Sequence, residues 1–194
     1  DLEGLPQSVR DAAALLAKQN GNEGKWMITL DNPSRLPFLQ YSSKRELREK
    51  VYKAYIMRGD NDNENDNKEI LRKMLSLRYQ KAKLLGYKNH AEFVLEERMA
   101  KSPEPIFELC NELMSRGTIA AKNEAAEMQK QIKAEGNNFK LEPWDWWYYA
   151  EKIRKQKFDI DEDQLRTYFP LENALKGVFS VSNKLYDLNF KQRD

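Results

Sequence analysis

The residues that could do chemistry are few, and the first of them is His90, the only histidine in the chain. A zinc site of the H-E-x-x-H type needs two histidines four residues apart on one helix, with a glutamate between them as base. A single histidine cannot supply it. A nucleophilic triad would need His90 beside a serine or cysteine. His90 instead follows Asn89, a typical helix N-cap, so we interpret it as a structural residue in the first turn of a helix.

Two acidic segments have the composition of a calcium-binding loop but lack its spacing. When Asp60 takes the first position, Asn65 takes the sixth and Leu71 the twelfth, where such a loop requires glycine and a bidentate glutamate. The second segment, which begins at "DIDEDQ" (159–164), fails in the same way, with Gln164 and Pro170 at the sixth and twelfth positions. We interpret both as solvated turns that place carboxylates ahead of helix N-termini, where the helix dipole favours negative charge.

The densest group of aromatic residues lies in "EPWDWWYYAEKIRK". Trp144, Trp147 and Tyr148 have the i, i+3, i+4 spacing of one helix face and are predicted to pack inward. Trp146 and Tyr149 share a second face. Such a block can border a groove that binds peptides or sugars, or anchor its helix in a core, and we favour the core. The residues of the candidate groove or docking surface are Trp144, Trp146, Trp147 and Tyr149.

The composition indicates a folded helical chain with a small net charge. The 194 residues include 33 Lys and Arg against 31 Asp and Glu, so there is no electrostatic reason to expect nucleic acid or an anionic membrane as partner. No apolar run approaches the roughly 20 residues that cross a bilayer. Cys110, the only cysteine, excludes an intrachain disulfide, and its place among apolar residues predicts a buried, inert thiol. The chain opens without Met and stops just after an apolar helix, so we expect both ends to be internal to a longer chain.

Apolar periodicity, together with capping and helix-ending residues, predicts a largely helical chain. The expected helices cover residues 8–21, 44–58, 67–86, 90–99, 103–134, 144–157 and 171–186. Ser42 or Ser43 is expected to cap the second of them and Asn89 the fourth. The segment 31–37 is expected to be a turn because of its two prolines. The segments 25–30 and 138–143 read as extended and could pair as a short ribbon.

Four segments together resemble one region of the thimet oligopeptidase family of zinc metallopeptidases, nearest to its bacterial peptidyl-dipeptidase (dipeptidyl carboxypeptidase) branch. They are "KWMITLDNPSRLPFL", "LRYQKAKLLGYKNHAEFVLEERMAKSPE", "FKLEPWDWWYYAEKIRKQKFDID" and "TYFPLENALKGVFSVSNKLYDLNF". The resemblance spans essentially the whole chain in the right order. Its most specific blocks are "LLGY–HA–F–LE", "WD–YY" and "YFPL".

The resemblance implies an almost wholly helical enzyme with two lobes around a deep channel for short peptides. It implies an H-E-x-x-H zinc helix with a further downstream Glu, and later substrate-binding Tyr and His residues. This chain ends before all of them, so no catalytic or metal-binding residue is carried over to it. Zinc would belong to the longer parent protein, and this chain's partner would be the remainder of that protein. The resemblance implies the cytoplasm for the parent, with the periplasm as the alternative.

We therefore predict an all-α fold, an irregular array of helices in which residues 1–194 form a single scaffold and channel-wall region of a larger peptidase. The parent would release dipeptides from the C-terminus of short peptides, while this chain alone would be inactive. The alternative is a free-standing helical module that holds a peptide or a partner protein on its "WDWWYY" face. That alternative predicts termini that are the natural ends of the protein, a soluble monomer and saturable peptide binding.

Overall fold

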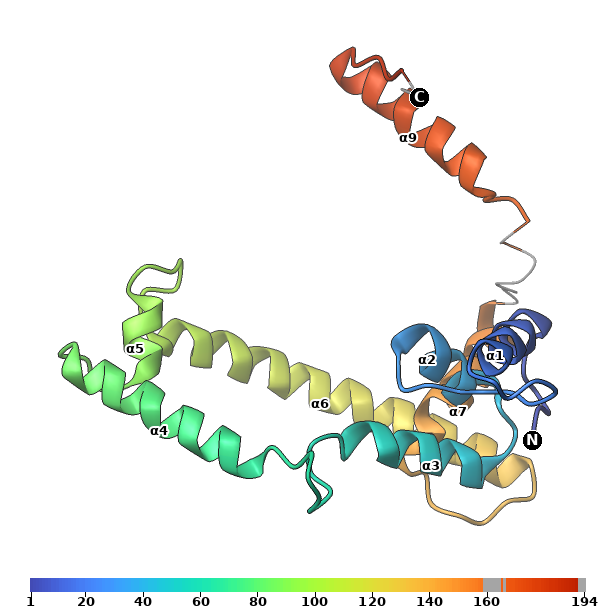
Figure 1. The fold of residues 1–194 in the computed structure, drawn as a ribbon, viewed down its shortest axis with the longest axis horizontal. Coiled ribbons are helices and arrows are strands. Elements are labelled where there is room, and N and C mark those ends of the chain that lie inside the picture. Colours follow the sequence, from blue (N-terminus) through green and yellow to red (C-terminus); the bar gives the residue numbers. More distant parts are fainter. Residues whose placement is uncertain (159–164, 166, 192–194) are drawn as a thin grey trace. The chain divides into compact units, whose positions relative to one another are not determined.

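The computed structural model describes residues 1–158, 165 and 167–191, and the regular secondary structure among them is helical (Figure 1). The all-α class predicted from the sequence is confirmed. The chain divides into two compact units, Asp1–Glu151 (unit 1) and Lys152–Asp194 (unit 2). The elements are α1 (Gln7–Gln19), α2 (Asn32–Tyr41), α3 (Arg45–Ile56), α4 (Lys68–Leu84), α5 (His90–Leu95), α6 (Pro103–Ala134), η1 (Pro143–Asp145), α7 (Trp146–Phe158) and α9 (Leu171–Tyr186).

The core of unit 1 lies where its N-terminal helices meet η1, the start of α7 and the C-terminal end of α6. Helix α1 packs on α2, α2 on α3, and α3 on η1. The buried apolar side chains of this region come from each of these parts except η1: Leu5, Ala13, Ala17, Phe38, Leu39, Met128, Ile132 and Tyr149. Arg35, Ser42, Arg48 and Asp145 are buried among them. The core is therefore small and contains charge, so its polar contacts matter as much as its apolar ones.

The predicted turn over 31–37 is wrong, because these residues begin α2. Pro33 lies in the first helical turn, where its missing N–H has no partner to lose. The backbone N–H groups of Ser34 and Arg35 both donate to the carbonyl of Asp31, which starts the helix before Pro37 is reached. Pro37 lies inside this short helix, which buries Arg35, Phe38 and Leu39.

The predicted two-stranded ribbon does not form, since the described residues contain no strand. In the first segment, Met27 donates its backbone N–H to the carbonyl of Ala13 at 3.0 Å. In the second, the N–H of Leu141 donates to the side-chain oxygen of Gln129 at 2.8 Å, and the Gln129 amide donates to the carbonyl of Phe139 at 3.0 Å. Helix α1 and a glutamine side chain thus take the hydrogen bonds that a partner strand would have taken.

Several helix ends follow their sequence signals, and two do not. Helix α6 has the predicted bounds, and α4 stops just before Gly86, whose φ of +89° suits glycine. Asn89 caps α5 as predicted, accepting the N–H of Glu92 at 3.0 Å. The predicted serine cap of α3 is wrong, because Lys44 takes that position. Helix α5 is also shorter than predicted and ends at Leu95.

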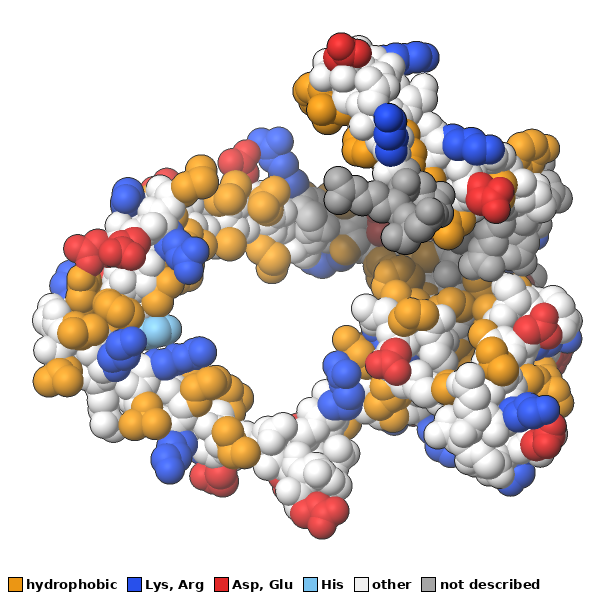
Figure 2. Space-filling model, turned by 45° about the horizontal axis from the view of Figure 1, so that its top comes forward, with side chains coloured by type: hydrophobic (Ala, Val, Ile, Leu, Met, Phe, Trp, Pro, Cys, Tyr) orange, Lys and Arg blue, Asp and Glu red, His pale blue; other side chains and the backbone are white. Residues whose placement is uncertain are grey.

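Large parts of the helices carry apolar side chains at the surface. Helix α4 buries only Ala82, and α6 buries only Met128 and Ile132, close to its C-terminal end. In unit 2, α9 has no buried residue, although its apolar residues recur at helical spacing. Figure 2 shows orange hydrophobic side chains reaching the visible surface, interspersed with blue Lys and Arg. Exposed apolar area of this extent marks surfaces that bind other polypeptide segments.

Candidate functional site

A buried cluster of two arginines and one aspartate joins α3 to the segment before α7. The Asp145 carboxylate is fully buried and accepts a hydrogen bond from Arg48 Nη2 at 2.9 Å. Arg45 donates to the same carboxylate through Nη2 at 2.9 Å and through Nε at 3.1 and 3.2 Å. Arg48 is itself 1% exposed. Each charge in the cluster therefore depends on the others, because a buried charge without a partner is costly.

Local structure places these three side chains. Arg45 and Arg48 are three residues apart on α3 and so project from one face of it. Asp145 is fixed by a reciprocal capping box, in which its carboxylate accepts the N–H of Glu142 while the Glu142 side chain accepts the N–H of Asp145. Arg48 also donates to the carbonyls of Ser42 at 2.7 Å and Trp144 at 3.3 Å.

Aromatic rings enclose the cationic side of the cluster. The Arg45 guanidinium lies 4.2 Å from the centre of the Phe139 ring and 5.5 Å from that of Trp144. The Arg48 guanidinium lies 4.1 Å from the centre of the Tyr148 ring. Burial alone would lower the pKa of Arg45, but the hydrogen bonds and the charge of Asp145 outweigh it, and the pKa is raised above its ordinary value. Arg45 thus stays charged, and the cluster locks α3 against the aromatic segment.

The capping box places Asp145 at the start of a helix, but the sequence pattern does not reveal the cluster that it forms with Arg45 and Arg48. The available signals were the Arg pair at i, i+3 on a predicted helix and the E-x-x-D spacing of Glu142 and Asp145. Neither signal identifies the residues that the side chains contact, because the two halves of the cluster lie about a hundred residues apart in sequence.

The four candidate docking residues lie in different environments. Trp144 and Trp146 are half-buried, Trp147 is 48% exposed and Tyr149 is 2% exposed. The prediction that Trp147 packs inward is therefore wrong, and it is Tyr149 that enters the core. Burial and the nearby charge of Glu135 raise the pKa of Tyr149 to about 12. A docking role for this set stays a prediction, and within it Trp147 offers the most surface.

His90 is the first residue of α5, as predicted. Its ring lies 6.2 Å from that of Phe93, centre to centre. The side chain of Asn89 takes the free N–H of the first helical turn, so the imidazole is not used for that purpose. Its Nδ1 atom is buried and has no hydrogen-bond partner among the described residues. The structural role of His90 stays a prediction.

The calcium-like segment of the sequence surrounds a lysine. The Lys68 ammonium lies 2.6 Å from a carboxylate oxygen of Asp60 and 2.8 Å from one each of Asp62 and Asp66. The hydrogen bonds from the Lys68 side chain and backbone hold the pKa of Asp66 at about 2. The carboxylates thus neutralise a lysine of this chain and order the turn that leads into α4.

Cys110 is exposed, so the prediction of a buried thiol is wrong for this chain. It lies on α6, and its helical neighbours Ile106, Leu113 and Met114 are exposed with it. The periodicity identified the apolar face correctly, but within the described residues that face is not covered. We call the surface formed by Ile106, Cys110, Leu113 and Met114 the α6 apolar face.

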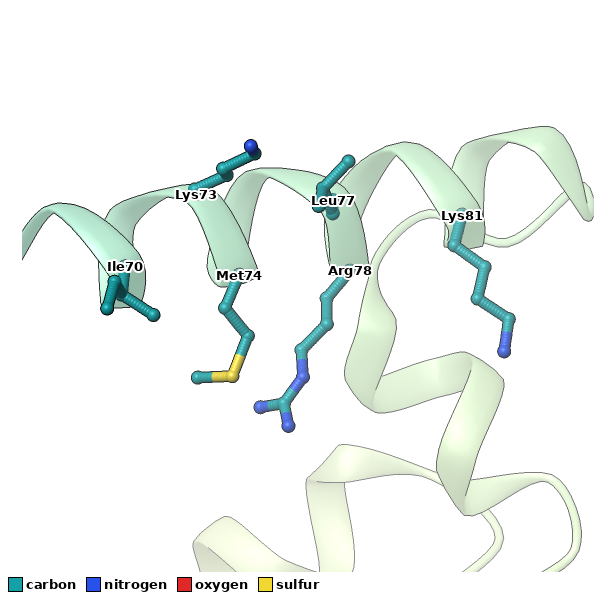
Figure 3. A pocket seen from close by; sticks show the side chains of 6 residues that line it. All are labelled: Ile70, Lys73, Met74, Leu77, Arg78 and Lys81. Carbon is teal, nitrogen blue, oxygen red and sulfur yellow. The ribbon is translucent and has the colours of Figure 1, made fainter. Parts of the chain in front are cut away.

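An open hollow of 540 Å³ lies on α4 (Figure 3). It is lined by Ile70, Lys73, Met74, Leu77, Arg78 and Lys81, which we call the α4 basic–apolar face. Met74, Arg78 and Lys81 extend to the same side of the helix in Figure 3. The Lys81 ammonium lies 5.0 Å from the centre of the Phe93 ring, which directs it toward α5. Three apolar and three basic side chains, with no acidic one, make up this face.

The described residues of this chain do not form a zinc site. The sequence has one histidine and one cysteine. Within the described part of the chain, no three His, Cys, Asp or Glu side chains gather where they could hold a metal ion. Among the same residues, no helix has the length and apolar character needed to span a membrane.

Comparisons with known proteins identify relatives along the whole chain. The sequence profile of Peptidase family M3 matches residues 38–194. Oligopeptidase A of Salmonella typhimurium is 35% identical over 100% of this chain and 29% of its own length. Dipeptidyl carboxypeptidase of Escherichia coli is 35% identical over 99% of this chain and 28% of its own length. The organellar oligopeptidase A of Arabidopsis thaliana is 37% identical over 100% of this chain and 25% of its own length. The chain thus spans less than a third of the length of these relatives.

Proposed function

Because this chain belongs to peptidase family M3, we propose that residues 1–194 form a helical, non-catalytic part of a longer zinc-dependent peptidase. The observation that carries the proposal is the match along the whole chain to peptidases more than three times its length. The chemistry of this chain's donor groups agrees with it, because its single histidine cannot form an H-E-x-x-H site. The zinc and the residues that activate water would then lie outside residues 1–194.

The exposed apolar faces support a scaffold role. On the α6 apolar face, Leu113 is 63% and Met114 is 66% exposed. On α9, Val178 is 59% exposed and belongs to an apolar stripe along that helix. Covering a side chain of this size contributes roughly 1.5–3 kcal/mol. The remainder of the same peptidase chain is the partner that we propose for these faces.

The finer proposal concerns the reaction of the parent. Oligopeptidase A and dipeptidyl carboxypeptidase are equally similar to this chain, at 35% identity. We propose the second activity, in which dipeptides are released from the C-terminus of short peptides. The helices of this chain would contribute scaffold and channel wall, and they would limit access to short, unstructured peptides.

The test compares the purified 194-residue chain with the longer peptidase on the same short peptides, with zinc supplied. The longer protein should release C-terminal dipeptides, and a chelator should stop it. The chain alone should leave every peptide intact. Zinc-dependent cleavage by the isolated chain would refute the non-catalytic assignment. Release of internal fragments in place of dipeptides by the longer protein would refute the finer proposal only.

A further inference from the structure

The α4 basic–apolar face combines exposed apolar side chains with cations. Ile70 and Leu77 are 65% and 53% exposed, while Met74 at their centre is 37% exposed. A helix that buries only Ala82 has little tertiary packing to stabilise it. Burial of its apolar side chains against another polypeptide segment would stabilise this helix.

The charges on this face are not balanced within the part of the chain that the structure describes. Neither Lys73 nor Arg78 has an ion pair or hydrogen bond there to an acidic side chain. Arg72, on another side of the same helix, forms an ion pair with Glu69. The helix thus neutralises a cation on its polar side and leaves two beside the apolar strip without a counter-charge.

We propose that the α4 basic–apolar face is the docking site for an acidic amphipathic helix of the same peptidase chain, from outside residues 1–194. This inference rests on the proposed function, and it specifies the partner of one face. More than two thirds of the length of the relatives lies outside the region that this chain matches, so polypeptide to fill the site is available. The partner helix would place apolar residues on Met74 and Leu77 and carboxylates beside Lys73 and Arg78.

A peptide substrate is the less favoured occupant of this face. A substrate leaves after each turnover, and the apolar strip of Ile70, Met74 and Leu77 would return to water each time. A guanidinium such as that of Arg78, by contrast, pairs bidentately with a carboxylate held in fixed geometry on a folded partner.

Photo-crosslinking identifies the occupant directly. Met74 is replaced by p-benzoylphenylalanine in the longer peptidase, the protein is irradiated, and the joined peptides are identified by mass spectrometry. Position 83 is the control, because Lys83 lies nine residues along α4 and so about two and a half turns away, on the opposite side. We expect position 74, and not 83, to join a segment outside residues 1–194 that is rich in Asp or Glu. A crosslink to added peptide substrate, to a second copy, or to a segment without acidic residues would overturn the inference, as would no crosslink.

Charge reversal provides the second measurement. Arg78→Glu in the longer peptidase should make proteolytic cleavage within α4 about tenfold faster, a factor equivalent to about 1.4 kcal/mol. Lys83→Glu on the same helix should leave the rate unchanged. Equal rates for the two variants would overturn the inference. The proposed function has a separate test in the activity comparison, so its failure would be recognised independently of this result.

Discussion

Arg48 and Asp145 form a buried ion pair, with Nη2 2.9 Å from Oδ1, although 97 residues separate them in the sequence. Arg48 lies on α3, and Asp145 closes η1 just before α7. This contact holds two distant parts of unit 1 together. Removing either partner would leave the other as a buried charge without a counter-charge, because both are buried.

Replacing Asp145 with Asn should destabilise unit 1 strongly. The amide keeps the size of the side chain but leaves Arg48 as a buried charge without a counter-charge, which costs about 3–5 kcal/mol. Urea unfolding of the 194-residue chain, followed by circular dichroism, measures the loss. The control is Lys53→Met, which removes an exposed pair with Glu49 and should cost less than about 1 kcal/mol. Equal losses for the two variants would show that the cluster does not hold the unit together.

Gln129→Leu should release the segment 139–141 from α6. The Gln129 amide satisfies both the carbonyl of Phe139 and the N–H of Leu141, and leaving these groups without partners costs about 2 kcal/mol. Hydrogen exchange of the Leu141 amide, measured by NMR, should become faster. Gln131→Leu is the matched control, because its amide donates to the Glu135 side chain at the surface. An unchanged exchange rate in Gln129→Leu would contradict this role.

The turn before α4 should lose stability in acid. The folded pKa of Asp66, about 2, lies below its ordinary value of 3.8. The contribution of Asp66 is therefore complete above pH 3.8 and is lost as the pH falls toward 2. Lys68→Met removes the largest cause of the shift, so the pKa of Asp66 should rise. Carbon-13 NMR titration of the Asp66 carboxyl measures it, with Lys73→Met as the control. A titration midpoint that stays near pH 2 in Lys68→Met would refute this explanation.

Cys110 is a built-in probe of the α6 apolar face. In the 194-residue chain its thiol is exposed and should react readily with a thiol reagent such as DTNB. In the longer peptidase the same thiol should react slower by about an order of magnitude or more, because a covered thiol is shielded from the reagent. Both proteins are compared in native buffer, with the denatured proteins as the reference for full reactivity. Equal rates in the two native proteins would mean that this face remains open in the parent.

Local sequence signals predicted much of the fold. The cap at Asn89 acts through the neighbouring backbone N–H of Glu92, so the sequence suffices to find it. The bounds of α6 likewise follow from the apolar periodicity of that segment. The two prolines of 31–37 favour a turn when they are read as helix breakers, although Pro33 in a first helical turn favours the helix that α2 forms. The ribbon was predicted from alternation alone, and the competing donors and acceptors of Gln129 could not be seen from that pattern.

The site depends on contacts between distant residues, and these were largely beyond sequence reasoning. The aromatic block was found, but its inward face was assigned to Trp147, whereas the ion pairs of Asp145 and the burial of Tyr149 determine how it packs. The burial of Cys110 was predicted from an apolar face without knowing whether a neighbour covers it. Periodicity shows which face of a helix is apolar, and only the partner decides whether that face is buried.

The most direct test of the central claim is to read the coding sequence beyond the codon for Asp194. We predict that the same frame continues into an H-E-x-x-H stretch with a further downstream Glu, which would supply the proposed zinc site of the longer peptidase. A stop codon directly after Asp194 would contradict it, and the chain would then have to act as a helical module by itself.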